Sequence, residues 1–262
     1  MRFVIFGDPV AHSRSPLMHN LAFRALGIDA CYGRWRLEEG AKLRETFFSL
    51  GLRGANVTVP HKEAAFAACD VLDPFAQKVG AVNTLVEREG KLHGYNTDAP
   101  GFLKAIEDFH AQDILFVGAG GTAQSTAVIL QEAGYTVTIL NRSARRLDAF
   151  ARQGFETATW ETFVPRRYDL IVNMTSAGLT DAQLPAPREL LGDLMRQASA
   201  AVDVIYGKET PFLALAKTHD LPTRDGKEML LYQGAIAFEY FTDHRYAFEE
   251  ILPHMRRAFD IH

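Results

Sequence analysis

DILFVGAGGTAQS (residues 113–125) is a short apolar run followed by small residues and then by residues that favour a helix. Glycines at the end of a buried strand let the backbone approach a pyrophosphate, and the first N–H groups of the next helix can donate to it. We expect a strand from Asp113, a helix from Thr122 to Ala133, and a phosphate-binding loop of Gly118, Ala119, Gly120 and Gly121. Ala123 stands where the third glycine of the dinucleotide-binding pattern usually lies, a replacement that the pattern tolerates. A helix packed closely on a strand without any ligand would also fit this stretch.

TVTILNRSARR (residues 136–146) follows and predicts a second strand, from Tyr135 to Leu140. In dinucleotide-binding folds the tip of this strand usually carries an acid that binds the ribose 2′-hydroxyl. Here no acid is present, and the tip consists of Asn141, Arg142, Ser143, Ala144, Arg145 and Arg146. Arginine side chains suit a 2′-phosphate, which an acid would repel. A solvated basic helix start is the plainer interpretation of the arginines alone, but both signals on successive strands favour NADP over NAD.

The composition limits the class of protein. The chain has 262 residues, 47% of them hydrophobic, and a formal net charge of −4, so one large or two modest domains are expected and a nucleic-acid partner is not. Cys31 and Cys69 have neither disulfide-scaffold nor metal-ligand spacing, so we expect no metal and a reducing cytoplasm. The N-terminus does not look like a signal segment, and no apolar run is long enough to span a bilayer.

Predicted strands alternate with predicted helices along the whole chain, which indicates an α/β fold with parallel-type sheets wound by helices. Several of the strands precede residue 113, so we expect a separate N-terminal domain. The expected strands are 2–6, 31–37, 54–59, 81–87, 92–95, 169–173 and 200–205, besides the two above. The expected helices are 15–26, 41–50, 62–69, 98–109, 144–152, 227–241 and 246–259. The last two helices could return to the N-terminal domain.

Polar residues interrupt the strand pattern in GANVTVPHK (residues 54–62). Strand periodicity places Asn56 and Thr58 on one face, and asparagine is depleted in strands, so contacts with a ligand are expected. Turn chemistry before Pro60 is the alternative. Lys62 begins the next helix, where an ammonium group is disfavoured unless it has a partner.

Two further segments show the same kind of pattern. AVNTLV carries Asn83 in an apolar strand, and GYNTD places Asp98 at a helix start, where it could simply be an N-cap. HSRSP supplies Ser13 and Ser15 in the loop after the first strand. Ser15 could cap the following helix, whereas Ser13 has no such role, so together they are candidates for binding a carboxylate.

At this point the chain resembles the shikimate dehydrogenases. The similar stretches are GDPVAHSRSPLMHN, GANVTVPHKE, GAVNT, GYNTDA, GAGGTA, NRSARR, NMTSAG, DVIYGKETPFL and DGKEMLLYQGA, in the order of that family and over nearly the whole chain. The resemblance implies a substrate-binding domain of residues 1–98 plus 226–262, a Rossmann-like NADP-binding domain of residues 99–225, and an active site in the cleft between them. It also implies reversible NADPH-dependent reduction of 3-dehydroshikimate to shikimate, in aromatic amino-acid biosynthesis, by a monomer or homodimer.

The resemblance further implies roles for individual residues. Lys62 and Asp98 resemble the catalytic pair. The implied substrate contacts are Ser13, Ser15, Asn56, Thr58, Lys62, Asn83, Asp98, Tyr206 and Gln233. The implied NADP(H) contacts are Gly118, Ala119, Gly120, Gly121, Thr122, Ala123, Asn141, Arg142, Ser143, Arg146, Thr175, Val204 and Gly226.

The chemistry requires a hydride from the cofactor and a proton for the developing alkoxide. Lys62 could donate that proton directly, or it could mainly polarise the ketone. Two alternatives stay open. One is a quinate/shikimate dehydrogenase of the same fold that uses NAD, and the other is a non-catalytic sensor of shikimate-like acids. The absence of an acid after Leu140 argues against the first, and the presence of both Lys62 and Asp98 argues against the second.

Overall fold

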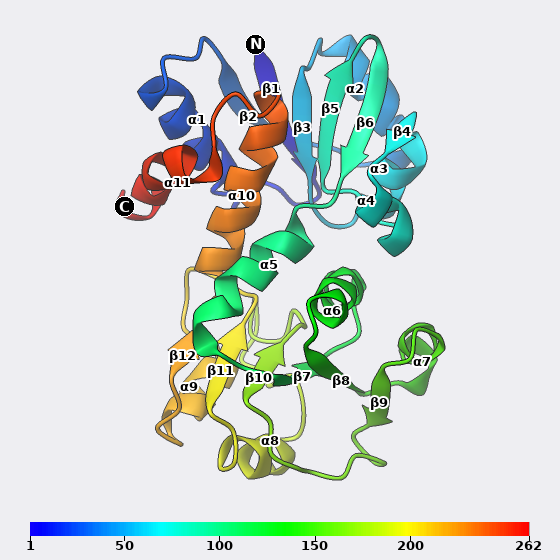
Figure 1. Cartoon of the computed structure of the whole chain (residues 1–262), viewed down its shortest axis with the longest axis vertical. Helices are drawn as coiled ribbons and strands as arrows, with labels where there is room; N and C mark the ends of the chain where they lie inside the picture. Colours follow the sequence, from blue (N-terminus) through cyan, green and yellow to red (C-terminus); the bar gives the residue numbers. More distant parts are fainter. Residues whose placement is uncertain (262) are drawn as a thin grey trace. The chain divides into compact units, whose positions relative to one another are not determined.

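The structure, a computed structural model, describes residues 1–261 and has an α/β fold with two six-stranded sheets (Figure 1). The chain divides into two compact units. The first unit consists of Met1–Gly101 together with the segment from Leu231 onward, and the second is Phe102–Leu230. The boundaries expected at residues 98 and 226 lie in the structure a few residues further along, inside helices α5 (Asp98–Ile106) and α10 (Lys227–Phe241). No helix within residues 1–261 is long and apolar enough to cross a membrane.

The sheet of the first unit has the strand order β2-β1-β3-β5-β6-β4. Its strands are β1 (Arg2–Gly7), β2 (Cys31–Arg36), β3 (Gly54–Val57), β4 (Val71–Leu72), β5 (Thr84–Arg88) and β6 (Lys91–Tyr95). The pairs β1–β2, β1–β3 and β4–β6 are parallel, whereas β5 runs antiparallel to both β3 and β6. This sheet is therefore mixed, because β5 and β6 form a hairpin around Glu89 and Gly90, both of which have positive φ.

Helices pack around this sheet. They are α1 (Ser15–Ala25), α2 (Leu43–Ser49), α3 (Lys62–Ala68), α4 (Pro74–Val79), the start of α5, most of α10, α11 (Phe248–Arg256) and the short 3₁₀ turns η1 (Gly40–Lys42) and η4 (Arg257–Phe259). The end of the chain packs on its beginning, since the ring of Phe241 in α10 lies 4.9 Å from that of Phe3 in β1. A second apolar cluster lies around Phe6, Phe47 and Leu85.

The sheet of the second unit is parallel throughout and has the order β12-β11-β10-β7-β8-β9. Its strands are β7 (Asp113–Val117), β8 (Thr136–Asn141), β9 (Glu156–Thr159), β10 (Leu170–Asn173), β11 (Ala200–Asp203) and β12 (Thr223–Arg224). Renumbered from β7, this is the strand order of the Rossmann fold, in which the ligand binds where the order reverses. The reversal lies between β7 and β10.

Helices connect the strands of this sheet. They are α6 (Gly121–Glu132), α7 (Asp148–Arg152), α8 (Arg188–Met195), α9 (Pro211–Lys217) and the 3₁₀ turns η2 (Glu107–Phe109) and η3 (Ala144–Arg146). An apolar core cluster of this unit includes Leu115, Ile171 and Phe212. The elements α4, α8, α9, β4, β9 and β12 are not among those expected from the sequence. The two-residue strands β4 and β12 are too short for a period to develop, whereas α8, α9 and β9 are no shorter than α3 and β3, which the sequence indicated. The helix expected over 144–152 is divided between η3 and α7.

Candidate active site

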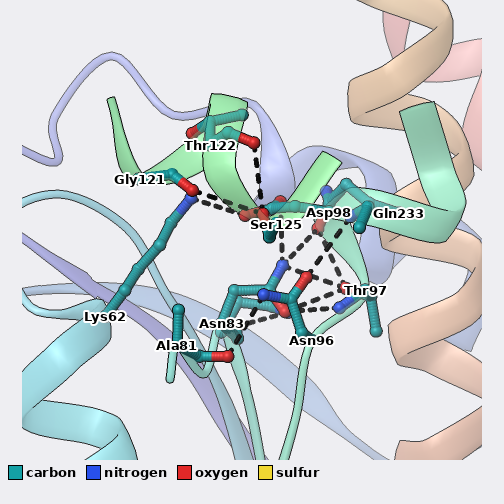
Figure 2. A network of polar contacts seen from close by, with 12 residues as sticks. Lys62, Ala81, Asn83, Asn96, Thr97, Asp98, Gly121, Thr122, Ser125 and Gln233 are labelled. Atoms are coloured by element: carbon teal, nitrogen blue, oxygen red, sulfur yellow. Dashed lines mark hydrogen bonds and ion pairs between the residues drawn. The ribbon is translucent and has the colours of Figure 1, made fainter. Parts of the chain in front are cut away.

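Lys62 and Asp98 form an ion pair in the first unit (Figure 2). Lys62 is the first residue of α3 and Asp98 the first of α5, and Lys62 Nζ donates to Asp98 Oδ2 at 2.5 Å. Their side chains are 20% and 13% exposed, so the pair is largely shielded but open to solvent. An ammonium group at a helix start needs a partner, and for Lys62 this partner is a carboxylate 36 residues further along the chain.

Asn83 holds the other oxygen of this carboxylate. It lies just before β5, is buried, and its Nδ2 donates to Asp98 Oδ1 at 2.9 Å. Its Oδ1 accepts from the backbone N of Thr97 at 2.7 Å, which fixes the orientation of the amide. Gln233 of α10 joins the group, since its Oε1 lies 3.4 Å from Asn83 Nδ2. The Asp98 carboxylate accepts from Lys62 and Asn83, whereas Asn96 Oδ1 accepts from the helix N–H of Ala99, so Asp98 is not acting as a plain N-cap.

Strand pairing brings Asn56 to the same network. Asn56 lies opposite Thr84 in the β3–β5 register, and its Nδ2 donates to Thr84 Oγ1 at 3.0 Å and to the carbonyl O of Asn83 at 3.3 Å. Its Oδ1 accepts from the hydroxyl of Tyr32 at 2.7 Å. Asn56 is 4% exposed and has protein partners at both ends of its amide, so its contact with a ligand stays a prediction.

Ser13 ends the loop before α1 and Ser15 is the first residue of that helix; both are buried, and their Oγ atoms lie 3.2 Å apart. The carbonyl O of Ser13 accepts from Nε and Nη2 of Arg34, and the side chain of Arg14 reaches the carbonyl O of Ala258. The expectation that Ser15 could cap the helix is wrong, because Arg14 occupies the N-cap position of α1 and Ser15 is the first helical residue. The expectation that Ser13 has no such role is also wrong, since its Oγ accepts from the backbone N of Ser15, the first N–H of the helix, at 3.3 Å. Both hydroxyls therefore lie at a junction of loop and helix that Arg34 and Arg14 anchor from two sides.

Thr58 follows β3 directly and is half-buried. Its backbone N donates to Phe6 O at 2.8 Å, and its methyl group packs against Gly7, where a Cβ atom would collide with it. Thr58 is thereby held near the carboxyl ends of β1 and β3.

In the second unit the glycine loop connects β7 to α6 at the reversal of strand order. Gly118 has a φ of +115°, and a Cβ atom there would lie 2.5 Å from Cγ2 of Thr175. A Cβ atom on Gly120 or Gly121 would meet nothing within 4 Å, so the backbone is open on that side. Helix α6 begins at Gly121 without a side-chain cap, which leaves the first N–H groups of the helix, up to the buried Ala123, available to an anion.

The tip of β8 forms a basic hollow. The hollow has a volume of about 560 Å³ and is lined by Asn141, Arg142, Ser143, Arg145 and Arg146. The three arginines are exposed, and among residues 1–261 none of them has a hydrogen-bond or ion-pair partner. Unpaired guanidinium groups around one hollow fit a phosphate group. Arg145 and Arg146 both line it, so the structure does not separate their roles.

An adjoining hollow of about 290 Å³ connects this tip with the glycine loop. It is lined by Gly118, Asn141, Arg142 and Arg146, by the turn Thr175–Ala177 after β10, and by Trp160, Asp181, Gln183, Leu184 and Pro185. Gly118 and the unpaired arginines share this hollow, and the first N–H groups of α6 follow Gly118 in the same loop. This arrangement fits a dinucleotide with an extra phosphate on its ribose.

Val204, Tyr206 and Gly226 lie together beyond β11. The backbone N of Gly226 donates to Ile205 O at 2.9 Å, and a Cβ atom on Gly226 would collide with the carbonyl group of Val204. Only glycine fits this close approach. Tyr206 belongs to the second unit and the other predicted substrate contacts to the first.

Sequence patterns missed several site residues. Thr97, Thr84 and Tyr32 complete the network around Asn83 and Asn56, and Trp160 and Asp181 line the second hollow. The NTD triplet was a usable signal for Thr97, whereas Tyr32 and Trp160 come from stretches with no distinguishing pattern. Within the described residues no group of His, Cys, Asp and Glu side chains could hold a metal ion.

Known proteins are similar to this chain over nearly its whole length. Residues 5–85 match the family model of the shikimate dehydrogenase substrate binding domain, and residues 102–176 match that of shikimate / quinate 5-dehydrogenase. The NADP(+)-dependent shikimate dehydrogenase of Helicobacter hepaticus is 46% identical over 93% of this chain and 92% of its own length. That of Thermus thermophilus is 40% identical over 92% of each chain.

Solved structures show the same fold. The crystal structure of shikimate 5-dehydrogenase from Thermus thermophilus in complex with NADP(H) and shikimate has a TM-score of 0.85 and 38% identity, and it covers 98% of this chain and 99% of its own. The expected α/β fold and the resemblance stated above are thereby confirmed. The chain belongs to the shikimate dehydrogenase family.

Proposed function

We propose that this chain catalyses the reversible NADPH-dependent reduction of 3-dehydroshikimate to shikimate, with Lys62 and Asp98 as its catalytic pair. The observation that carries the proposal is the contact of Lys62 Nζ with Asp98 Oδ2, while Asn83 Nδ2 binds the other carboxylate oxygen. The names of the relatives in Helicobacter and Thermus support the reaction, and the NADP(H) and shikimate in the Thermus complex support the ligands. We assign substrate binding to the first unit and cofactor binding to the second.

On the substrate side, two groups of residues have distinct tasks. The hydroxyls of Ser13 and Ser15 would bind the carboxylate, with Thr58 nearby, since hydroxyl donors suit a carboxylate acceptor. Asn83, Asp98 and Gln233 would bind the ring hydroxyls. The network around Asn83, in which Asn56 takes part, preorganises this second group, because each amide has one orientation compatible with its neighbours.

The proton step follows from the ion pair. In the reductive direction the carbonyl carbon of the substrate gains a hydride and its oxygen becomes an alkoxide. The ammonium group of Lys62, held by Asp98, would first polarise that carbonyl and then give the oxygen a proton, after which solvent reprotonates the amine. Asp98 holds Lys62 in place and accepts a hydrogen bond from a neighbouring hydroxyl of the substrate.

On the cofactor side, NADPH supplies the hydride when it is bound. The loop from Gly118 to Thr122 would receive the pyrophosphate. Asn141, Arg142, Ser143 and Arg146 would bind the adenosine with its 2′-phosphate, and Thr175, Val204 and Gly226 would line the nicotinamide. The proposal for the phosphate is supported by the unpaired guanidinium groups at the tip of β8.

The test is a steady-state assay of the purified chain with shikimate or quinate and with NADP⁺ or NAD⁺, following the absorbance of the reduced cofactor. We expect oxidation of shikimate with NADP⁺, and a loss of roughly 10²–10⁴-fold in kcat for Lys62→Ala with little change in the KM for shikimate. Lys91→Ala, at an exposed lysine on β6 of the same unit, is the matched control and should keep wild-type rates. No turnover of shikimate by the wild-type chain would contradict the function. A folded Lys62→Ala enzyme with near-normal kcat would contradict the catalytic pair alone.

A further inference from the structure

Asp203 is a fully buried carboxylate to which the reaction above assigns no task. It is the last residue of β11 and is 0% exposed. Among the described residues it forms no ion pair, and the groups that bind it are neutral donors. Its Oδ2 accepts from Asn173 Nδ2 at 3.0 Å and from Thr210 Oγ1 at 2.6 Å, and its Oδ1 accepts from the backbone N of Ile205 at 2.9 Å. Burial without a cation raises the pKa of this carboxyl, and the hydrogen bonds oppose that effect.

These partners connect three segments of the second unit. Asn173 ends β10, Ile205 follows β11, and Thr210 is the N-cap of α9, whose Leu213 N–H it accepts at 3.3 Å. A buried charged group is retained against its cost of desolvation only where it is well bonded. The carboxylate of Asp203 therefore fixes the relative positions of two strand ends and a helix start.

The consequence reaches the cofactor site through Asn173. Because Asn173 turns its Nδ2 toward Asp203, its Oδ1 faces Thr175 and accepts from the backbone N at 3.0 Å and from Oγ1 at 2.7 Å. Thr175 Oγ1 in turn accepts from the backbone N of Ala177 at 3.1 Å. The opposite orientation of the Asn173 amide would set its donors against the N–H of Thr175 and its oxygen against Asp203. Asp203 therefore stabilises the observed orientation together with Thr175 and with the carbonyl O of Ala177, to which Nδ2 also donates at 3.4 Å.

The turn held in this way borders the proposed dinucleotide site. Thr175, Ser176 and Ala177 line the second hollow together with Gly118, Arg142 and Arg146. Cγ2 of Thr175 packs against Gly118 so closely that no larger residue fits there. A shift of the turn would therefore change the wall of the hollow next to the glycine loop.

We propose that Asp203 is a positioning residue for NADP(H): through the amide of Asn173 it holds the turn Thr175–Ala177 in the orientation that receives the cofactor. This inference rests on the proposed function. It concerns cofactor affinity rather than binding of shikimate, because the carboxylate and the groups that bind it lie in the second unit.

Asp203→Asn tests the proposal, because asparagine has nearly the same shape as aspartate but carries an NH₂ donor in place of one acceptor oxygen. That donor would face either Asn173 Nδ2 or the N–H of Ile205. We expect the Kd for NADPH, measured by fluorescence titration without substrate, to rise roughly tenfold, and the KM for shikimate at saturating cofactor to stay near wild type. The matched control is Asp169→Asn. Asp169 precedes β10 at the opposite end of that strand and accepts from the backbone N of Gln112 and Asp113, so its substitution should leave the Kd unchanged.

A reciprocal swap separates positioning from a general loss of stability. In the double variant Asp203→Asn with Asn173→Asp, the new amide donates to the new carboxylate, whose other oxygen still accepts from Thr175. We expect this variant to bind NADPH within about threefold of wild type, because the acceptor toward Thr175 and the hydrogen bond between positions 173 and 203 are both kept. The long 3.4 Å contact of Asn173 Nδ2 with the carbonyl O of Ala177 is the one that the swap does not restore. Its folding is checked by thermal unfolding without cofactor, so the swap decides the question even where Asp203→Asn fails to fold.

Two results would overturn the inference. One is a folded Asp203→Asn chain with the wild-type Kd for NADPH, and the other is a folded double variant whose Kd for NADPH is still tenfold or more above the wild-type value. Failure of the unaltered chain to bind NADPH would instead contradict the proposed function. The two failures are distinguishable, because the first compares variants and the second concerns the wild-type chain alone.

Discussion

We expect the stability of the first unit to depend on pH through His19. It lies in α1, is 0% exposed, and its ring stacks on Tyr32 at a centroid distance of 4.3 Å and an interplanar angle of 4°. Phe238 and Phe241 of α10 cover it from other sides, at 5.9 Å and 5.5 Å. Within residues 1–261 neither ring nitrogen has a hydrogen-bond partner. Burial lowers the pKa of His19 to about 3, from its ordinary value of 6.5.

The sign of the effect follows from proton linkage. The folded state keeps the imidazole neutral, whereas the unfolded chain protonates it below about pH 6.5. The stabilising contribution is therefore fully present above that pH and is lost as the pH falls from about 6.5 toward about 3. Each pH unit within this window costs about 1.4 kcal/mol, so a change from about pH 7 to about pH 5 removes about 2 kcal/mol from the free energy of unfolding.

The assay is urea unfolding of the wild type and of His19→Phe at both pH values, each in a Trp160→Phe background. Trp35 on β2 then reports the first unit by its fluorescence, because the other tryptophan belongs to the second unit. His19→Phe keeps an aromatic ring in the stack but has no group that titrates, so we expect its loss of stability to be about 2 kcal/mol smaller than that of the wild type. Comparison between the two proteins cancels the contributions of other titrating groups. An equal loss in both proteins would refute the reasoning.

The remaining predictions concern binding and catalysis. Arg142→Ala should weaken NADP⁺ far more than NAD⁺, by roughly 1.5–3 kcal/mol, since it removes a charge-assisted contact to the 2′-phosphate; cofactor titrations check this, and equal losses for both cofactors would contradict it. Ser13→Ala should raise the KM for shikimate several-fold at unchanged cofactor affinity, and unaltered shikimate kinetics would show that Ser13 serves only the structure of its loop. Asp98→Ala should lower kcat and also raise the KM for shikimate, whereas Lys62→Ala should change mainly kcat; steady-state kinetics of both variants, with folding checked by circular dichroism, would show the difference, and identical profiles would argue against separate roles.

The nucleotide-binding half of this chain could be predicted from local patterns. The run into Gly118, the helix behind it and the arginines after Leu140 each depend on neighbours within a few residues, and the structure has β7, α6 and β8 where these patterns indicate them. The strand and helix starts that carry Lys62 and Asp98 were visible for the same reason.

The partnerships of side chains depended on the tertiary structure. Strand register placed Asn56 beside Thr84, and the packing of α1 and α10 enclosed His19 and Tyr32, whose hydroxyl then orients Asn56. The helix α9 was not predicted, although its N-cap Thr210 precedes a proline, and only the structure shows that Thr210 also donates to the buried Asp203.

The physical reason is the range of the interactions. Backbone periodicity, capping preference and glycine conformations are set within about one turn of helix or one strand, and a single sequence records them directly. Burial of a carboxylate or an imidazole depends on which distant segments come together, and so do the donors that remain for it. The sequence by itself determined which chemical groups this protein carries at the ends of its strands and helices, and only the tertiary structure decided which of them face one another.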